Sequence, residues 1–215
     1  MTVAALYVEA GGVYCDLPDV DPWDERRDAR LYAGPWPVVA HPPCNHWCQL
    51  ASVNAARYES FKIGDDGGCF EAALNAVRTW GGVLEHPAYS LAWFAYGLPV
   101  PGHGGWTQAF DEPGYTTAVS QVAYGHVARK RTWLYAVGCD LPVLDWSEPP
   151  AEGQVGIGPH RGNKAIKLQH GASSKTPAAF RDVLLAMARS AAPHAGPQVQ
   201  LLTGPTNPRK ARGCR

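Results

Sequence analysis

A cysteine follows a double proline at the end of a short apolar run. Trp36–Ala40 reads as a buried strand and leads directly into His41-Pro-Pro-Cys44. Proline fixes the backbone, and ligands of open α/β sheets bind at the carboxyl ends of strands, so this thiol is rigidly presented where ligands bind. A nearby helix N-terminus would lower the pKa of the Cys44 thiol and favour the nucleophilic thiolate. A plain turn with a buried, unreactive Cys44 fits the same residues.

The same segment supports a metal-binding alternative. Zinc accepts four ligands of the histidine and cysteine type, and the segment offers four of them: His41, Cys44, His46 and Cys48. Their spacing is not that of a zinc finger, so no metal is expected here.

A carboxylate follows a second apolar run, in Gly81-Gly-Val-Leu-Glu-His-Pro87. Partial burial would raise the pKa of Glu85 and let it donate or share a proton. A solvated glutamate in a turn before proline is the alternative.

A third segment, Gln121–Arg131, combines a glycine turn with a basic cluster and aromatic neighbours. Arginine, lysine and tyrosine in such a pattern can hold phosphates and stack on a base. The alternative is a solvated basic loop.

These segments need a sheet to bring them together. Apolar runs predict strands at Val3–Val8, Trp36–Ala40, Val83–Leu84, Tyr115–Ala123 and Thr132–Val137. Apolar residues at helical spacing predict a helix over Phe70–Trp80. A terminal helix should begin after a Ser174 or Thr176 cap with Pro177 in its first turn. Residues 15–36 and 97–114 read as loops, the former with at most one short exposed helix.

Composition sets the class of protein. The 215 residues are 46% hydrophobic and 18% charged, with 19 basic and 19 acidic side chains. This is a globular composition without an overall positive field, so any nucleic-acid site must be a local patch. No long apolar stretch or signal peptide is evident, which predicts a cytoplasmic protein without a membrane partner. The six cysteines are expected to be reduced.

The expected organisation is a single α/β domain over residues 1–192. Residues 140–172 form a short insertion within it, and residues 193–215 form a basic, disordered tail.

Taken in order, these motifs resemble the core of DNA cytosine methyltransferases that act at ring carbon 5, especially compact phage-encoded members. His41-Pro-Pro-Cys44-Asn45 is similar to their Pro-Cys-Gln block, and Glu85-His86-Pro87 to their Glu-Asn-Val or Glu-Asn-Pro block. Gln121–Arg131 is similar to their Gln-x-Arg-x-Arg block, and the match in order spans residues 38–185. The resemblance implies a compact Rossmann-like, methyltransferase-like mixed sheet with flanking helices.

It also implies a chemistry. Cys44 would add to carbon 6 of a cytosine taken out of the stack, and Glu85 would protonate ring nitrogen 3. Arg129 and Arg131 would hold the base carbonyl or nearby phosphates. Three aromatic residues would fill or line the gap left by the base, namely Trp47, Trp106 and Tyr124.

The implied methyl donor is S-adenosylmethionine. Its site would be formed by the first strand's exit and the double proline, through Glu9, Gly11, Gly12, Asp21 and Pro43. The 25 residues or so between the first two strands leave little room for the usual first helix and second strand, so a different one-carbon donor is a variant of this hypothesis.

DNA is the expected partner. Backbone contacts are predicted for Gln121, Lys130, Arg161, Lys164 and Lys167. The alternative function is a catalytically inactive DNA-binding protein on the same scaffold, which would protect phage DNA.

Overall fold

The computed structural model describes residues 1–111, 113–151, 153–154 and 175–192. Its centre is a mixed seven-stranded sheet in the order β2-β1-β3-β4-β8-β6-β5. The strands are β1 (Val3–Leu6), β2 (Val20–Trp23), β3 (Val38–Ala40), β4 (Gly82–Pro87), β5 (Thr107–Gln108), β6 (Tyr115–Ser120) and β8 (Arg131–Val137). A separate small pair joins β7 (Ala128–Arg129) to β9 (Gly153–Gln154).

One half of the sheet is parallel. β1 lies between β2 and β3, and β3 pairs in turn with β4. Val3–Leu6 and Val38–Ala40 are buried along their whole length, as expected for parallel strands covered on both faces. Gly82 lets β3 and β4 approach closely, because it has φ +114° and a Cβ there would lie 2.0 Å from the Val38 carbonyl oxygen.

The other half is antiparallel. β8 runs antiparallel to β4 and to β6, so β6 runs in the direction of the parallel strands. The register places Glu85 opposite Leu134 and Ser120 opposite Arg131. This pairing brings the ends of the second and third motifs to the edge where the parallel strands end.

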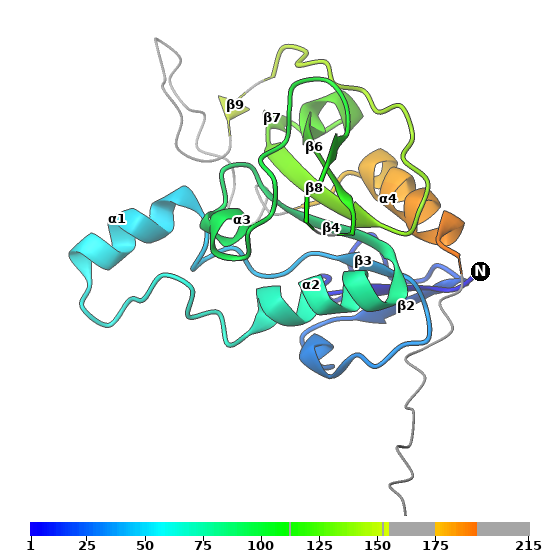
Figure 1. Ribbon diagram of the computed structural model, residues 1–215, viewed down its shortest axis with the longest axis horizontal. Coiled ribbons are helices and arrows are strands. Elements are labelled where there is room, and N and C mark those ends of the chain that lie inside the picture. The colour runs from blue at the N-terminus through cyan, green and yellow to red at the C-terminus, as the bar shows by residue number, and fades with distance from the viewer. Residues whose placement is uncertain (112, 152, 155–174, 193–215) are drawn as a thin grey trace, which may run out of the picture.

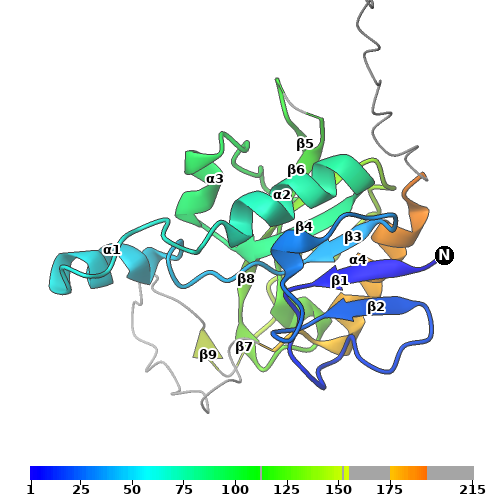
Figure 2. The same cartoon turned by 90° about the horizontal axis from the view of Figure 1, so that it is seen from below.

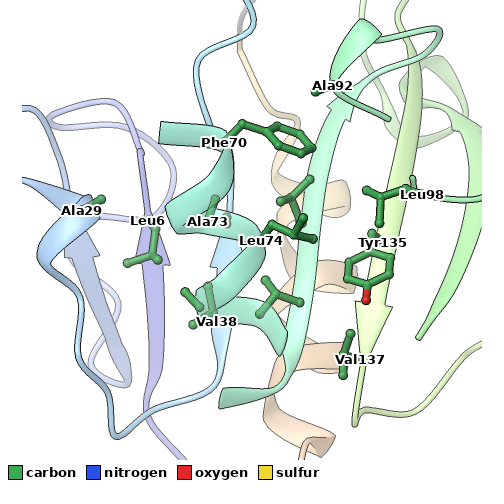
Figure 3. Packing of buried hydrophobic residues seen from close by; sticks show 14 of the residues in the cluster. Leu6, Ala29, Val38, Phe70, Ala73, Leu74, Ala92, Leu98, Tyr135 and Val137 are labelled. Atoms are coloured by element: carbon green, nitrogen blue, oxygen red, sulfur yellow. The ribbon is translucent and has the colours of Figure 1, made fainter. Parts of the chain in front are cut away.

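Helices cover both faces of the sheet (Figures 1 and 2). α2 (Cys69–Trp80) packs on β3, β4 and β8 through Phe70, Ala73, Leu74 and Val77. Figure 3 shows Phe70 and Leu74 against Leu6, Val38 and Tyr135 on this face. α3 (Leu91–Ala95) adds Trp93 to the same cluster. α4 (Ala178–Ser190) covers the opposite face, on β1, β3 and β4.

α1 (Gln49–Arg57) extends away from the sheet (Figure 1). Ala51 is the one buried residue of α1, so the sequence of this helix has no apolar periodicity from which it could be predicted. α3 also went unpredicted, because five residues are too few for a helical period.

Most predicted elements are confirmed, with the following corrections. The predicted loop over residues 97–114 contains the short strand β5, and the strand predicted over Tyr115–Ala123 ends at Ser120, where a 3-10 helix over Gln121–Tyr124 follows. Residues 15–36 hold a short 3-10 helix, as allowed, but also the strand β2, which was not expected. Pro22 is tolerated in β2 because the strand lies at the sheet edge and pairs on one side only. β4 extends to Pro87, so Glu85 and His86 lie within the strand. Pro177 occupies the N-cap of α4, which has no side-chain cap.

Two other expectations can be compared with the structure. The five described cysteines, Cys15, Cys44, Cys48, Cys69 and Cys139, are free thiols. No helix in the described ranges is long and apolar enough to cross a bilayer. The predicted tail, residues 193–215, lies outside the described residues, as do residues 152 and 155–172 of the predicted insertion.

Candidate active site

The candidate site lies where β1 and β3 end. The chain leaves β1 for β2 on one side and then returns to β3 on the other, so the strand order switches direction between β1 and β3 (Figure 2). Open α/β sheets bind ligands outside the carboxyl ends of strands at such a switch point. The loops that follow β1 and β3 carry Glu9–Gly12 and His41–Cys44.

Cys44 stands at the start of a helical turn. The His41 amide donates to the Leu6 carbonyl (3.0 Å), which extends the β1–β3 ladder by one residue before the two prolines. The Cys44 carbonyl then accepts from the amides of Trp47 (2.9 Å) and Cys48 (2.8 Å), and Cys48 caps α1. The partly buried Cys44 thus lies four residues before the N-cap of α1, while its rigid presentation by the two prolines stays a prediction.

Glu85 is the centre of a buried hydrogen-bond network. Its side chain lies on the α4 face of β4, and the residue is 5% exposed. Oε1 accepts from Gln121 Nε2 (3.0 Å) and Thr132 Oγ1 (3.2 Å), and Oε2 accepts from His41 Nδ1 (2.9 Å). The Gln121 amide also donates to Thr132 Oγ1 (2.9 Å). Three segments far apart in the sequence therefore fix one carboxylate.

Tyr14 extends this network. Its hydroxyl lies 2.8 Å from His41 Nε2. Because the Glu85 carboxylate can only accept, His41 Nδ1 carries the hydrogen of that bond, and Nε2 is the ring nitrogen that meets the Tyr14 hydroxyl. Burial and the nearby Glu85 charge raise the pKa of Tyr14, which keeps the hydroxyl protonated. The chain Tyr14–His41–Glu85 thus sets the orientation of the imidazole and of the carboxylate.

The electrostatics differ from the expectation for both reactive groups. Burial alone would raise the pKa of Glu85, but the Lys130 charge and the hydrogen bond from His41 outweigh it and lower the pKa to about 2. Burial, together with Cys48 and Glu85, raises the pKa of Cys44 to about 11. The predicted proton-donating Glu85 and the predicted low thiol pKa are therefore wrong for the ligand-free protein. It carries an ionised carboxylate and a neutral thiol.

Lys130 takes the inward position that was predicted for an arginine. It is 8% exposed, and its charge acts on both Glu85 and Cys44. Arg129 and Arg131 instead meet Glu148. Arg131 Nε and Nη2 donate to its two oxygens (2.7 and 3.0 Å), while Arg129 Nε lies 3.7 Å away. The two predicted catalytic arginines are thus paired with an acidic side chain.

His86 points to the other face of β4. Its ring packs edge-on to Phe70 (centroids 5.1 Å apart) and stacks with Trp93 (6.4 Å). Burial lowers the pKa of His86 to about 4, so the ring is neutral at pH 7. It contributes to the core that supports Glu85.

The predicted donor site is only partly assembled. Gly11 has φ +67° and open space beside it, so a ligand can approach the backbone closely. Asp21, however, is engaged through both oxygens, by Arg27 Nη1 (2.5 Å) and Trp23 Nε1 (2.9 Å). No helix connects β1 to β2. Of the residues predicted to bind the donor, Gly11 thus leaves room for a ligand, whereas Asp21 is already held by other side chains and does not fit that role.

The predicted nucleic-acid contacts divide into two groups. Gln121 is fully buried and binds Glu85, so it is a positioning residue rather than a surface contact. Lys130 likewise faces the site. Arg161, Lys164 and Lys167 lie outside the described residues.

The three aromatic residues predicted to line a gap are engaged in packing. Trp47 Nε1 donates to Asp66 Oδ2 (2.8 Å), and Trp106 Nε1 donates to the Pro142 carbonyl (2.9 Å). Tyr124 packs on Phe180 and accepts from the Asp145 amide (2.9 Å). None of the three has its polar group free for a base.

The metal alternative finds no support in the described part of the chain, which includes residues 41–48. No three His, Cys, Asp or Glu side chains there could jointly hold a metal ion.

Sequence reasoning missed Tyr14, His41 and Thr132 as members of the network. Thr132 had a usable signal, because it stands two residues before Leu134, the partner of Glu85, and residues two apart in a strand share a face. Tyr14 had none. Comparison with known protein families, curated proteins and solved structures finds no match to this chain.

Proposed function

We propose that this protein modifies cytosine in DNA at carbon 5, through addition of Cys44 to ring carbon 6. The observation that carries the proposal is the convergence of Cys44 after β3, Glu85 within β4 and Lys130 just before β8, near enough for the charges of Glu85 and Lys130 to act on Cys44. A thiol, an acceptor fixed by three hydrogen bonds and a buried cation are the groups this reaction needs. The switch in strand order and the antiparallel β8 also fit the Rossmann-like, methyltransferase-like mixed sheet that the resemblance implies.

The protonation states assign the roles. An ionised Glu85 accepts a hydrogen bond from the exocyclic amino group and thereby holds the base. The Cys44 sulfur forms a bond to carbon 6, and the electron pair of the C5=C6 bond moves into the ring toward carbon 5. The thiol proton goes to ring nitrogen 3. Negative charge that develops on nitrogen 3 and the neighbouring carbonyl is stabilised by the Lys130 ammonium.

Carbon 5 would then displace the one-carbon group from its donor, whose leaving group keeps the electron pair of the broken bond. The proton on carbon 5 passes to water, its electron pair re-forms the C5=C6 bond, and the C6–S bond breaks. The Cys44 thiolate so released takes back the proton from nitrogen 3. S-adenosylmethionine is the donor we propose, and it would supply a methyl group. The addition of Cys44 does not depend on this choice. The target base must leave the duplex or come from a single strand to reach the thiol. Such an enzyme would act in the cytoplasm, in a phage-infected host.

Hydrogen exchange at carbon 5 tests the addition without any donor. DNA tritiated at carbon 5 of cytosine is incubated with the protein in water, and released tritium is counted. Addition of the thiol makes carbon 5 accept a solvent proton, and elimination then releases tritium. Release is expected from the wild type and from Cys48→Ala, the neighbouring thiol, but not from Cys44→Ala. Equal release from Cys44→Ala would refute the proposal.

A second candidate is a DNA-binding protein without catalysis. It is favoured by the high thiol pKa of Cys44 and the low pKa of Glu85, which are the reverse of an activated pair. It predicts DNA binding that is unchanged in Cys44→Ala, with no tritium release from the wild type. Addition of S-adenosylmethionine would then transfer no methyl group.

A further inference from the structure

A pocket of about 290 Å³ opens beside the candidate site, at the same edge of the sheet. It is lined by Ala88 just after β4, Ser120 at the end of β6 and Arg131 at the start of β8. Because β6 runs in the direction of β4 and β8 runs opposite, these three positions mark the edge at which β3 also ends, four residues before Cys44. Thr132 lines the pocket and binds Glu85, so it joins the pocket to the network.

The pocket has aromatic walls. Tyr89, Trp133 and Trp146 line it, and the Tyr89 and Trp133 rings lie 5.2 Å apart. Tyr89 is 50% exposed and has φ +62°, a backbone conformation that is unusual for a bulky residue. A strained residue that leaves an aromatic ring half open to solvent at a pocket is typical of a binding site.

The edge of the pocket carries an arginine that can bind an anion through two hydrogen bonds. The Arg131 guanidinium binds Glu148 through two parallel hydrogen bonds of 2.7 and 3.0 Å, and Arg129 lies 3.7 Å from the same carboxylate. This geometry binds phosphate as well as carboxylate. Glu148 is 40% exposed at its side chain, so an incoming phosphate can exchange with it.

We propose that this pocket binds one unpaired nucleobase next to the target cytosine, with the adjoining phosphate on Arg131 in place of Glu148. The volume lies just below the usual range for ligand sites, roughly 300–1,000 Å³, which suits one ring system rather than a base pair. This inference rests on the proposed function, since DNA is the ligand of both. It makes Tyr89 and Arg131 contact residues for the nucleotide beside the reacting one.

The test combines removal of one base from the DNA probe with removal of the Tyr89 ring from the protein. The probe is a short, fluorescently labelled single-stranded oligodeoxynucleotide with one cytosine, together with two versions that are abasic at its 5′ or its 3′ neighbour. Stacking on an aromatic side chain is worth about 1–3 kcal/mol per base, or about fivefold to 150-fold in affinity. Wild-type protein should lose that factor with one abasic probe. Tyr89→Ala should lose it with the intact probe and lose little more with the abasic one.

Two variants serve as controls. Tyr89→Phe keeps the ring and should bind like the wild type. Tyr58→Ala removes a tyrosine of similar exposure, 58%, that does not line the pocket, and should leave both affinities unchanged. Circular dichroism and the melting temperature check that Tyr89→Ala is folded.

The outcomes separate this inference from the proposed function. If both abasic penalties stay the same in Tyr89→Ala while Cys44-dependent tritium release persists, the pocket inference is wrong and the proposed reaction stands. If the penalty disappears in Tyr89→Ala but no tritium is released, the pocket inference stands and the protein is a binder. Failure of the wild type to bind the intact probe overturns the pocket inference.

Discussion

Replacing Glu85 by glutamine should cost the protein a large part of its stability at neutral pH. The carboxylate is buried and accepts three hydrogen bonds, and its pKa is lowered from the ordinary 4.5 to about 2. At 1.36 kcal/mol per pH unit, that difference corresponds to about 3 kcal/mol of unfolding free energy. Glutamine keeps an oxygen for Gln121 and Thr132, but its amide group would face the His41 Nδ1 hydrogen.

The pH dependence supplies the sharper test. A carboxyl group with a lowered folded-state pKa stabilises the fold above the unfolded-state pKa, and this stabilisation is lost as the pH falls from about 4.5 toward 2. Urea unfolding of wild type and Glu85→Gln is measured at pH 7 and at steps down to pH 3. The gap should be about 3 kcal/mol at pH 7 and should shrink with acid.

Glu148→Gln is the matched control for this experiment. Glu148 pairs with Arg131 at a half-exposed site, where such pairs contribute about 0.2–1 kcal/mol. A gap below about 1 kcal/mol for Glu85→Gln at pH 7, or a gap that does not change with pH, would refute the ionised, hydrogen-bonded carboxylate.

Three further outcomes are expected. The rate at which iodoacetamide alkylates Cys44, followed by peptide mass spectrometry, should keep rising with pH up to about pH 11, because burial raises the thiol pKa. A plateau below pH 8 would contradict this. The free energy of unfolding of the wild type should fall by up to about 3 kcal/mol between pH 6.5 and 4, because the unfolded chain protonates His86 while the buried ring stays neutral. His86→Asn should remove this part of the pH dependence. An unchanged pH dependence in that variant would contradict the neutral, buried ring. Glu148→Gln should leave Arg131 able to bind phosphate and so raise the affinity for DNA. The slope of log affinity against log salt concentration should become steeper by about 0.9 per added phosphate contact. Unchanged salt titrations would argue against an anion site.

The core of the fold was predictable because its signals are local. Val3–Leu6 and Val38–Ala40 are continuous apolar runs, and the apolar spacing of Phe70–Trp80 matches the face that packs on the sheet. β2 was missed because an edge strand needs neither an apolar run nor a proline-free sequence. α1 was missed because it buries almost no surface against the sheet.

The sequence pointed to Cys44 and Glu85, but neither to the Tyr14, His41 and Thr132 members of the network nor to the charges of the site. The order of the strand exits was enough to place Cys44 near Glu85. Which basic side chain faces them depends on strand alternation and on Glu148, some 17 residues away from Arg131 in the chain. The pKa values depend on burial and on Lys130 together, and neither can be read from residue types alone.

The central claim is that Cys44 forms a covalent bond to cytosine. Trapping tests it most directly: DNA that contains 5-fluorocytosine is incubated with the protein, with and without S-adenosylmethionine, and analysed by denaturing gel and intact mass spectrometry. Fluorine blocks the final elimination, so the adduct persists. We expect a complex in the presence of the donor that survives in Cys48→Ala and is lost in Cys44→Ala. DNA binding without any complex, in either condition, would contradict the claim.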